Sequence, residues 1–127
     1  MKKDIENRAD IYLLVKHFYT KLMNDNLMRH FFLEFSKPDL LEEHLQTLVD
    51  FWDNVLFYSG GYRKNAMLPH LALHQKKPIS KKHFNAWLSM FSCSVDELFE
   101  GEVAHQAKSR AQSIAIVMEI KISELNK

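Results

Sequence analysis

Residues 67–91 hold three histidines and a tryptophan at spacings that could serve a metal site. His70 and His74 stand four residues apart. His83 follows them, and Trp87 comes one helical turn after it. A neutral imidazole is a common metal ligand, and residues at positions i and i+4 lie on the same face of a helix. The first question is therefore whether one of these histidines binds a metal, and in which kind of site.

Two kinds of non-haem metal site are poorly supported by the sequence. The zinc-protease pattern requires a glutamate directly after the first of two histidines, and Leu71 occupies that position. A carboxylate-bridged di-iron bundle requires two Glu-x-x-His pairs, and only Glu102 with His105 has this spacing. Both patterns are incomplete, so a non-haem metal site is a poor interpretation of these histidines.

A haem pocket needs one axial imidazole, an apolar cage for the macrocycle and a few hydrogen-bond donors on the ligand side. His70 or His74 could be the axial ligand. Tyr19, His44 and Trp87 could supply a phenol O–H, an imidazole N–H and an indole N–H from three different segments. The cage could be lined by Phe31, Phe32, Leu48, Phe51 and Trp52.

Apolar residues at helical spacing predict two long helices in the first half of the chain. One apolar stripe runs from Ile11 to Met23. The second helix is expected to begin at Ser36 as its N-cap and to end at Gly60 and Gly61. Residues 27–35 between them are expected to form a few turns across the core. The inner face of the second helix is predicted to be His44, Leu48, Phe51, Trp52 and Val55.

The second half of the chain predicts one short and two long helices. The short helix would lie between Pro69 and Pro78 and carry two of the histidines. Ser80 is the expected N-cap of the next helix, which would end at Gly101. Its inward residues would be Phe84, Trp87, Leu88, Phe91, Val95 and Leu98, and those of the last helix Ala104, Ala107, Ala111, Ile114, Ala115, Met118 and Ile122. The pattern predicts an all-α fold.

Length and composition indicate one compact domain over residues 1–127. The chain is 46% hydrophobic and has a formal net charge of +1, so no overall field favours nucleic acid. The first residues lack the apolar core of a signal peptide, and Cys93 is the one cysteine, so we expect a cytoplasmic protein. Every apolar run is far shorter than the roughly 20 residues that cross a bilayer. A monomer without membrane contact is the simplest expectation.

Four stretches together carry a resemblance to a known family. They are HFYTKLMND with Tyr19, EEHLQTLVDFW with His44, YRKNAMLPHLAL, and HFNAWLSMF with Trp87. They resemble the third (P) group of the truncated haemoglobins, a bacterial globin family, over most of the chain. The resemblance implies a shortened globin fold with helices packed two over two around haem b. The family's proximal histidine follows an MxxHxxL pattern, which Met67, His70 and Leu73 match.

The resemblance also implies roles for individual residues. His70 would bind the iron, Tyr19 and Trp87 would donate to a diatomic ligand, and His44 would lie at the distal mouth. Counting back from Trp87 would make His74 the ligand instead, but we favour His70 because it fits the motif and follows Pro69. Arg63 could meet the haem propionates, although a solvated loop explains it equally well. The haem-contacting set is then Phe31, Phe32, Leu48, Phe51, Trp52, Arg63, Met67 and Phe84.

Two classes of function follow. The first is a haem protein that binds O₂, NO or CO, with a phenol and an indole donor slowing ligand escape. Oxidation of NO to nitrate, or reduction of the ligand by an unidentified electron donor, would make it an enzyme, with no side chain assigned as catalytic. A peroxidase role is weaker because no carboxylate partner for His70 is identifiable. The alternative is a cofactor-free helical interaction module, which would leave Tyr19, His44 and Trp87 without a common purpose.

Overall fold

The computed structural model describes residues 2–58 and 78–125, and all regular elements in these ranges are helices. In chain order they are α1 (Arg8–Asn24), the 3₁₀ helix η1 (Arg29–Ser36), α2 (Pro38–Phe57), α4 (Lys81–Leu98) and α5 (Glu102–Leu125). The predicted all-α class is confirmed. The predicted short helix between Pro69 and Pro78 lies mostly outside the described residues. No helix within these ranges is long and apolar enough to cross a membrane.

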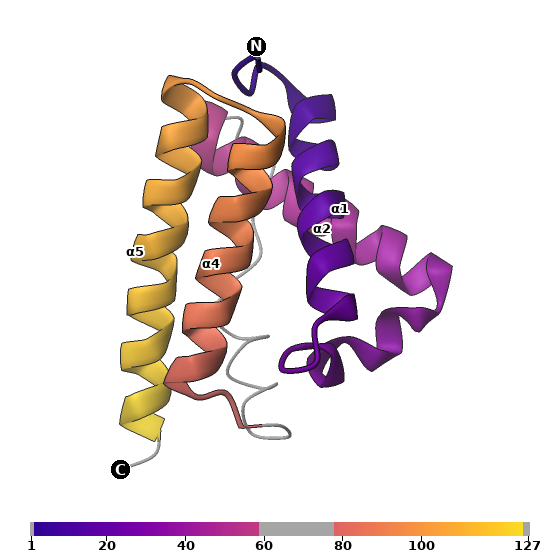
Figure 1. Cartoon of the computed structure of the whole chain (residues 1–127), viewed down its shortest axis with the longest axis vertical. Coiled ribbons are helices and arrows are strands. Elements are labelled where there is room, and N and C mark those ends of the chain that lie inside the picture. The colour runs from indigo at the N-terminus through magenta and orange to yellow at the C-terminus, as the bar shows by residue number, and fades with distance from the viewer. Residues whose placement is uncertain (1, 59–77, 126–127) are drawn as a thin grey trace.

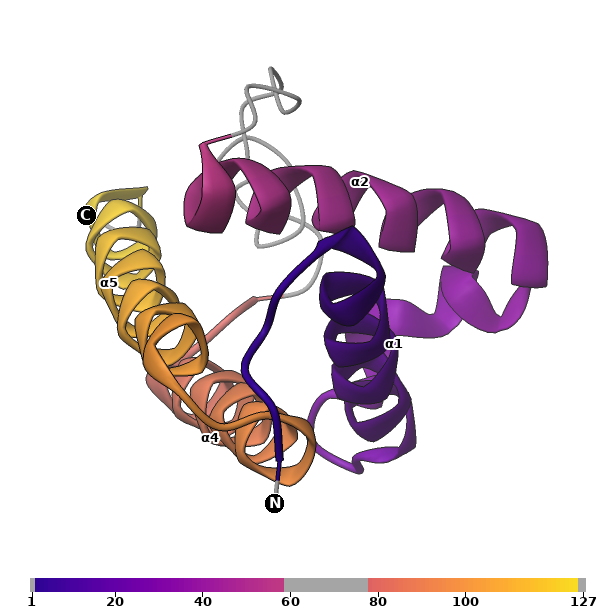
Figure 2. The ribbon, with the colours of Figure 1, turned by 90° about the horizontal axis from the view of Figure 1, so that it is seen from above.

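The helices form two pairs that pack against each other. Helices α4 and α5 run antiparallel, with α5 returning beside α4 along its whole length (Figure 1). Helix α1 packs against α2 on one side and against α4 on the other. Seen from above, α2 passes alongside α1, and α4 and α5 lie next to each other (Figure 2). This arrangement brings side chains from α1, α2 and α4 to one region, and these are the three helices that carry the predicted donors Tyr19, His44 and Trp87.

Helix α1 follows its predicted apolar stripe. The Asn7 side chain caps it by accepting a hydrogen bond from the backbone N–H of Asp10, 3.0 Å away. Met23, at the end of the predicted stripe, is half-buried. The other predicted residues are all buried, namely Ile11, Leu14, Val15, Phe18, Tyr19 and Leu22.

Both predicted ends of α2 are wrong by a few residues. Ser36 still belongs to η1, and Lys37 is the N-cap with Pro38 at the first helical position. Lys37 has an extended backbone, the conformation that a following proline favours, so the helix starts one residue later than expected. The helix also ends at Phe57, before the glycines, because Tyr58 takes the left-handed conformation with φ of 55°.

The inner face of α2 is shifted by one residue from the prediction. Two neighbouring rows of apolar residues run along the helix, and the second row is the one that packs into the core. The deeply buried row is Leu45, Val49, Trp52 and Leu56. The predicted row is half-buried except for Trp52, and consists of His44, Leu48, Phe51 and Val55. A wide apolar face leaves its deepest line undetermined from spacing alone.

Helix α4 begins at Ser80, which is its N-cap as predicted. The backbone N–H of Ser80 donates to Nδ1 of His83, 2.9 Å away, so His83 takes the place of the glutamate in a capping box. Phe91 and Val95 are buried. The remaining predicted inward residues are half-buried, namely Phe84, Trp87, Leu88 and Leu98.

Helix α5 packs through small side chains on its predicted face. Ile114 is half-buried. The buried residues are Ala104, Ala107, Ala111, Ala115, Met118 and Ile122. The small alanines allow close approach to the neighbouring helix, and α4 is the main partner of α5.

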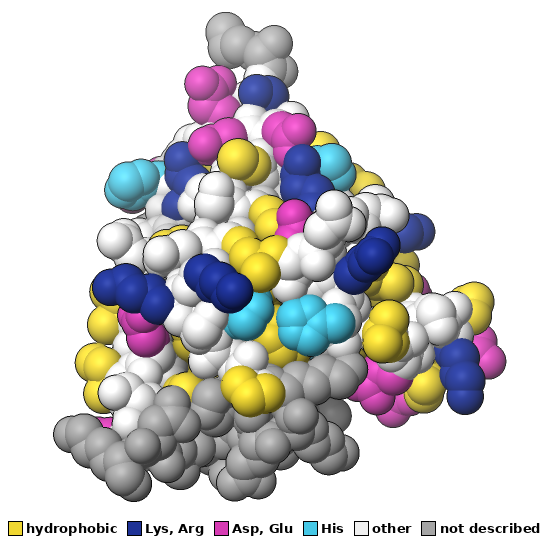
Figure 3. Space-filling model, turned by 60° about the horizontal axis from the view of Figure 1, so that its bottom comes forward, with side chains coloured by type: hydrophobic (Ala, Val, Ile, Leu, Met, Phe, Trp, Pro, Cys, Tyr) yellow, Lys and Arg dark blue, Asp and Glu magenta, His cyan; other side chains and the backbone are white. Residues whose placement is uncertain are grey.

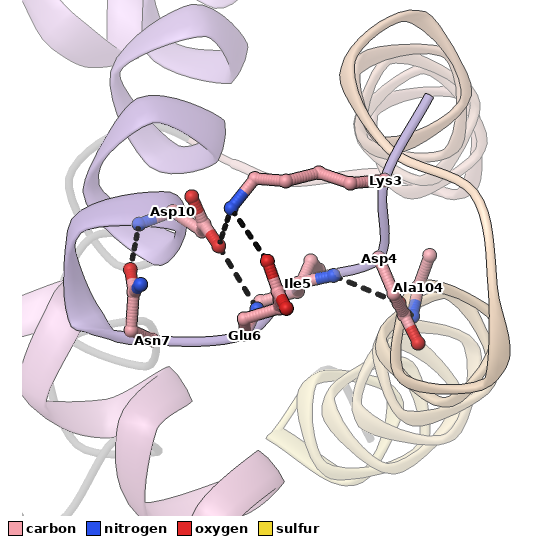
Figure 4. A network of polar contacts seen from close by, with 7 residues as sticks. All are labelled: Lys3, Asp4, Ile5, Glu6, Asn7, Asp10 and Ala104. Carbon is pink, nitrogen blue, oxygen red and sulfur yellow. Dashed lines mark hydrogen bonds and ion pairs between the residues drawn. The ribbon is translucent and has the colours of Figure 1, made fainter. Parts of the chain in front are cut away.

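The N-terminal segment joins the starts of α1 and α5 (Figure 4). The Asp4 carboxylate accepts hydrogen bonds from the backbone N–H groups of Val103 at 2.9 Å and Ala104 at 2.8 Å. Nearby, the Lys3 ammonium donates to Asp10 at 2.7 Å. Asp4 therefore caps a helix that starts almost a hundred residues later in the chain.

Candidate functional site

Two of the predicted distal residues meet in a hydrogen bond. The Tyr19 hydroxyl on α1 lies 2.8 Å from Nε2 of His44 on α2. Tyr19 is only 8% exposed, whereas His44 is half-buried. Burial raises the pKa of Tyr19 well above its usual range, so its hydroxyl keeps its proton at neutral pH. The pair is therefore a protonated phenol held by an imidazole.

Aromatic rings fix the orientation of this pair. The Phe35 ring stacks on His44 with centroids 4.5 Å apart and an angle of 18° between the planes. The Phe32 ring meets Tyr19 edge to face, with centroids 5.3 Å apart. Such contacts restrict both side chains to one arrangement. Phe35 was not among the predicted site residues, although it lies only nine positions before His44 in an aromatic-rich segment.

Trp87 belongs to the same aromatic cluster. Its ring meets Phe18 edge to face at 5.7 Å and stacks parallel to Phe91 at 5.9 Å. Phe18 in turn meets Tyr19 at 5.7 Å, so it lies in ring contact with both predicted donors. The structure thus brings Tyr19, His44 and Trp87, from three helices, into one connected group of rings.

A small cavity lies beside this group. Its volume is about 70 Å³, which is room for a few water molecules or a diatomic ligand. Met28, Ile79, Ala115 and Met118 line it without having been predicted as site residues. The complete lining is Tyr19, Met28, Phe31, Phe32, Ile79, His83, Phe84, Trp87, Ala115 and Met118. Among the predicted cage residues, Phe31, Phe32 and Phe84 therefore share one cavity with Tyr19 and Trp87.

Three predicted cage residues on α2 do not line this cavity. Leu48 and Phe51 are half-buried on the row of α2 that also carries His44. Trp52 is buried in the core, where its ring stacks on Phe91 with centroids 4.9 Å apart. Their predicted contact with haem remains a prediction.

His83 lines the cavity, although the sequence did not single it out as a site residue. It is the third residue of α4, in the N-terminal turn of the helix. The structure adds that its ring is buried and lines the cavity. The signal in the sequence is its spacing of four residues from Trp87, which puts both on one helix face.

The remaining predicted site residues lie outside the described ranges. These are the axial candidates His70 and His74, together with Arg63 and Met67 of the haem-contacting set. Within residues 2–58 and 78–125, no group of three or more histidine, cysteine or carboxylate side chains could hold a metal ion. Cys93 is exposed on α4.

Comparison with known proteins identifies the family. The family model described as bacterial-like globin matches residues 4–121. The chain belongs to the bacterial-like globin family. The group 3 truncated hemoglobin ctb of Campylobacter jejuni is 27% identical over 117 residues, which cover 91% of this chain and 90% of that protein.

A solved structure gives the same result at the level of the fold. The crystal structure of a group III truncated hemoglobin from Campylobacter jejuni matches with a TM-score of 0.86 and 26% identity. The match covers 96% of this chain and 95% of that one. The truncated globin fold and the resemblance to group III truncated haemoglobins are confirmed. Membership of a globin family implies that this chain is a haem-binding globin.

Proposed function

We propose that the protein holds haem b through His70 and binds a diatomic ligand such as O₂, NO or CO. The observation that carries this proposal is the hydrogen bond of 2.8 Å between Tyr19 and His44, beside a cavity that Tyr19 and Trp87 line. Membership of the bacterial-like globin family supports the cofactor. When bound, haem supplies an iron that takes up the gas and can change its oxidation state.

The residues around the cavity fit such a group. The cavity has room for a diatomic ligand, and the three phenylalanines and two methionines on its wall are apolar side chains of the kind that pack against the edge of a macrocycle. Tyr19 and Trp87 add hydrogen-bond donors. A buried phenol whose pKa is raised stays protonated, so it can donate to a ligand on which negative charge develops. The apolar wall limits the water that would compete for this hydrogen bond.

His44 decides where the phenol proton points. If Nε2 of His44 carries a proton and donates to the Tyr19 oxygen, the tyrosine proton is free to face the cavity. If Nε2 accepts instead, the tyrosine proton is held by the imidazole. We propose that the first arrangement is the ligand-binding one, and that Trp87 supplies a second donor from α4.

The lifetime of the bound gas determines which reactions are open to it. Bound O₂ held by two donors would have time to combine with NO and one electron from a partner protein to give nitrate, and another bound ligand could accept electrons from the same partner. We propose this gas chemistry in a monomer of one domain over residues 1–127, with an electron donor that is not yet identified.

The cofactor is tested with the absorption spectrum of the purified protein, with haemin added where needed. We expect a sharp Soret band at one haem per chain, which moves after reduction and exposure to CO. The variant His70→Ala should lose tight haem binding, whereas the matched control His74→Ala should keep it. The reverse pattern would assign the iron to His74, and failure of the unchanged chain to take up haem would favour the helical interaction module.

A further inference from the structure

The His83 ring at the start of α4 is held in one tautomer. Its Nδ1 accepts a hydrogen bond from the backbone N–H of Ser80 at 2.9 Å, and the Ser80 hydroxyl lies 3.0 Å from the same nitrogen. Because Nδ1 accepts, the proton of the neutral ring is on Nε2. The capping box therefore leaves His83 with one fixed N–H donor.

This donor lies in an apolar place. His83 is 8% exposed, and its ring forms part of the cavity wall. Within the described residues, the hydrogen bonds of His83 involve Nδ1 and none involves Nε2. An N–H on a cavity wall with no partner among the described residues can donate to a group bound in that cavity.

The charges around His83 favour an anion. The His30 ring lies next to it, with centroids 5.7 Å apart, and Lys82 is its neighbour in sequence. Burial first, and then the positive charges of His30 and Lys82, lower the pKa of His83, and no acidic group of the described chain acts on it. On the face shown in Figure 3, two histidine side chains lie side by side, with basic side chains above them on either side.

A cavity with an apolar wall, one fixed donor and cations at its side matches a ligand with an apolar body and a carboxylate. The haem of the proposed function is such a ligand, because its macrocycle is apolar and its two propionates are anionic. We propose that His83 donates its Nε2–H to a haem propionate, with Lys82 adding positive charge and the His30 ring lying beside it. This inference rests on the proposed function, and it assigns to His83 two roles, in the helix cap and in cofactor binding.

Two substitutions separate these roles. Glutamate is the usual third residue of a capping box, so His83→Glu keeps an acceptor for the Ser80 N–H but removes the donor and adds a negative charge. Glutamine also keeps the acceptor, and its amide N–H₂ can still donate. The control His105→Glu makes the same charge change at an exposed position on α5. Urea unfolding of the haem-free proteins should show that all three variants remain folded.

The measurement is the rate at which haemin leaves each protein for an excess of apomyoglobin. His83→Glu should release haemin at least about tenfold faster than the unchanged chain, which corresponds to the loss of one hydrogen bond to a charged group. His83→Gln and His105→Glu should stay within about threefold, on the same scale. With haemin dimethyl ester, which has no propionate charge, the difference between His83→Glu and His83→Gln should disappear.

A second measurement observes the His83 ring nitrogen directly by NMR. With zinc protoporphyrin, the nitrogen NMR signal of Nε2 should shift further on binding than with the zinc dimethyl ester, because the macrocycle is the same and only the propionate charge differs. The inference is overturned if His83→Glu holds haemin as tightly as the unchanged chain, or if it releases haemin and its ester equally fast. Neither result would touch the proposed function, because haem uptake by the unchanged chain and the His70→Ala and His74→Ala variants test it separately.

Discussion

The Tyr19 hydroxyl is the residue-scale feature on which ligand binding depends most. It is buried, stays protonated and lies beside the cavity. We expect Tyr19→Phe to speed O₂ dissociation about tenfold, because one hydrogen bond to the ligand is lost. Stopped-flow measurement of O₂ release checks this. The matched control is Tyr12→Phe, since the Tyr12 hydroxyl donates to Glu42 at 2.8 Å and does not line the cavity.

Tyr19 and His44 should act as one unit. If His44 orients the phenol, His44→Leu should speed O₂ dissociation by less than Tyr19→Phe does. The double variant should then be no faster than Tyr19→Phe alone, because the imidazole acts only through the hydroxyl. Effects that multiply in the double variant would show that His44 contacts the ligand independently.

The sequence predicted the members of the site better than their contacts. Tyr19, His44 and Trp87 were selected as donors, and the structure joins them through a hydrogen bond and ring contacts. The cavity-lining position of His83 was missed because a lone histidine near a helix start is explained by capping alone. Side-chain direction depends on the packing of other helices, which spacing along one helix does not contain.

At the scale of elements, the helix starts and buried faces were partly predictable. Ser80 was recognised as the cap of α4 because its side chain and the following pattern are local features. The shift of the α2 core face by one residue was not recognisable, since both rows on that helix are apolar. Which row is buried depends on where α1, η1 and α5 approach α2, and that is a property of the assembled fold.

The turn between α4 and α5 offers a test at this scale. Gly101 has φ of +143°, and a Cβ at that position would lie 2.5 Å from the Asp4 carboxyl carbon. We expect Gly101→Ala to lower the free energy of unfolding by more than about 2 kcal/mol, because both backbone strain and a clash result. Urea unfolding measures the change. Ser109→Ala on the exposed face of α5 is a control that should cost far less.

At the scale of the whole molecule, the N-terminal segment connects distant parts of the chain. Asp4 caps α5, and Asp10 accepts a hydrogen bond from the Lys3 ammonium near the start of α1 (Figure 4). Both carboxylates act as anions in these contacts. Burial raises the pKa of Asp4, but hydrogen bonds from backbone N–H groups outweigh it and hold the pKa below the usual 3.8. Burial also raises the pKa of Asp10, and its hydrogen bond with Lys3 outweighs that effect.

These shifts predict an acid-sensitive fold. Because both pKa values are lower in the folded state than the unfolded value of 3.8, the stabilisation is fully present above that pH. It is lost as the pH falls below 3.8 through the folded-state values. Asp4→Asn keeps an acceptor oxygen for the start of α5 but cannot titrate, so the variant should lose less stability between pH 5 and pH 3 than the unchanged chain.

Urea unfolding of haem-free protein at several pH values in this range measures the difference. The matched control is Asp96→Asn, because Asp96 pairs with Lys108 at the surface, where ion pairs contribute little. Its stability should change with pH as that of the unchanged chain does. If Asp4→Asn also followed the unchanged chain, the carboxylate of Asp4 would not be ionised in its cap, and acid sensitivity would have to arise elsewhere. A flatter profile for Asp4→Asn alone would show that one N-terminal carboxylate couples the start of the chain to its last helix.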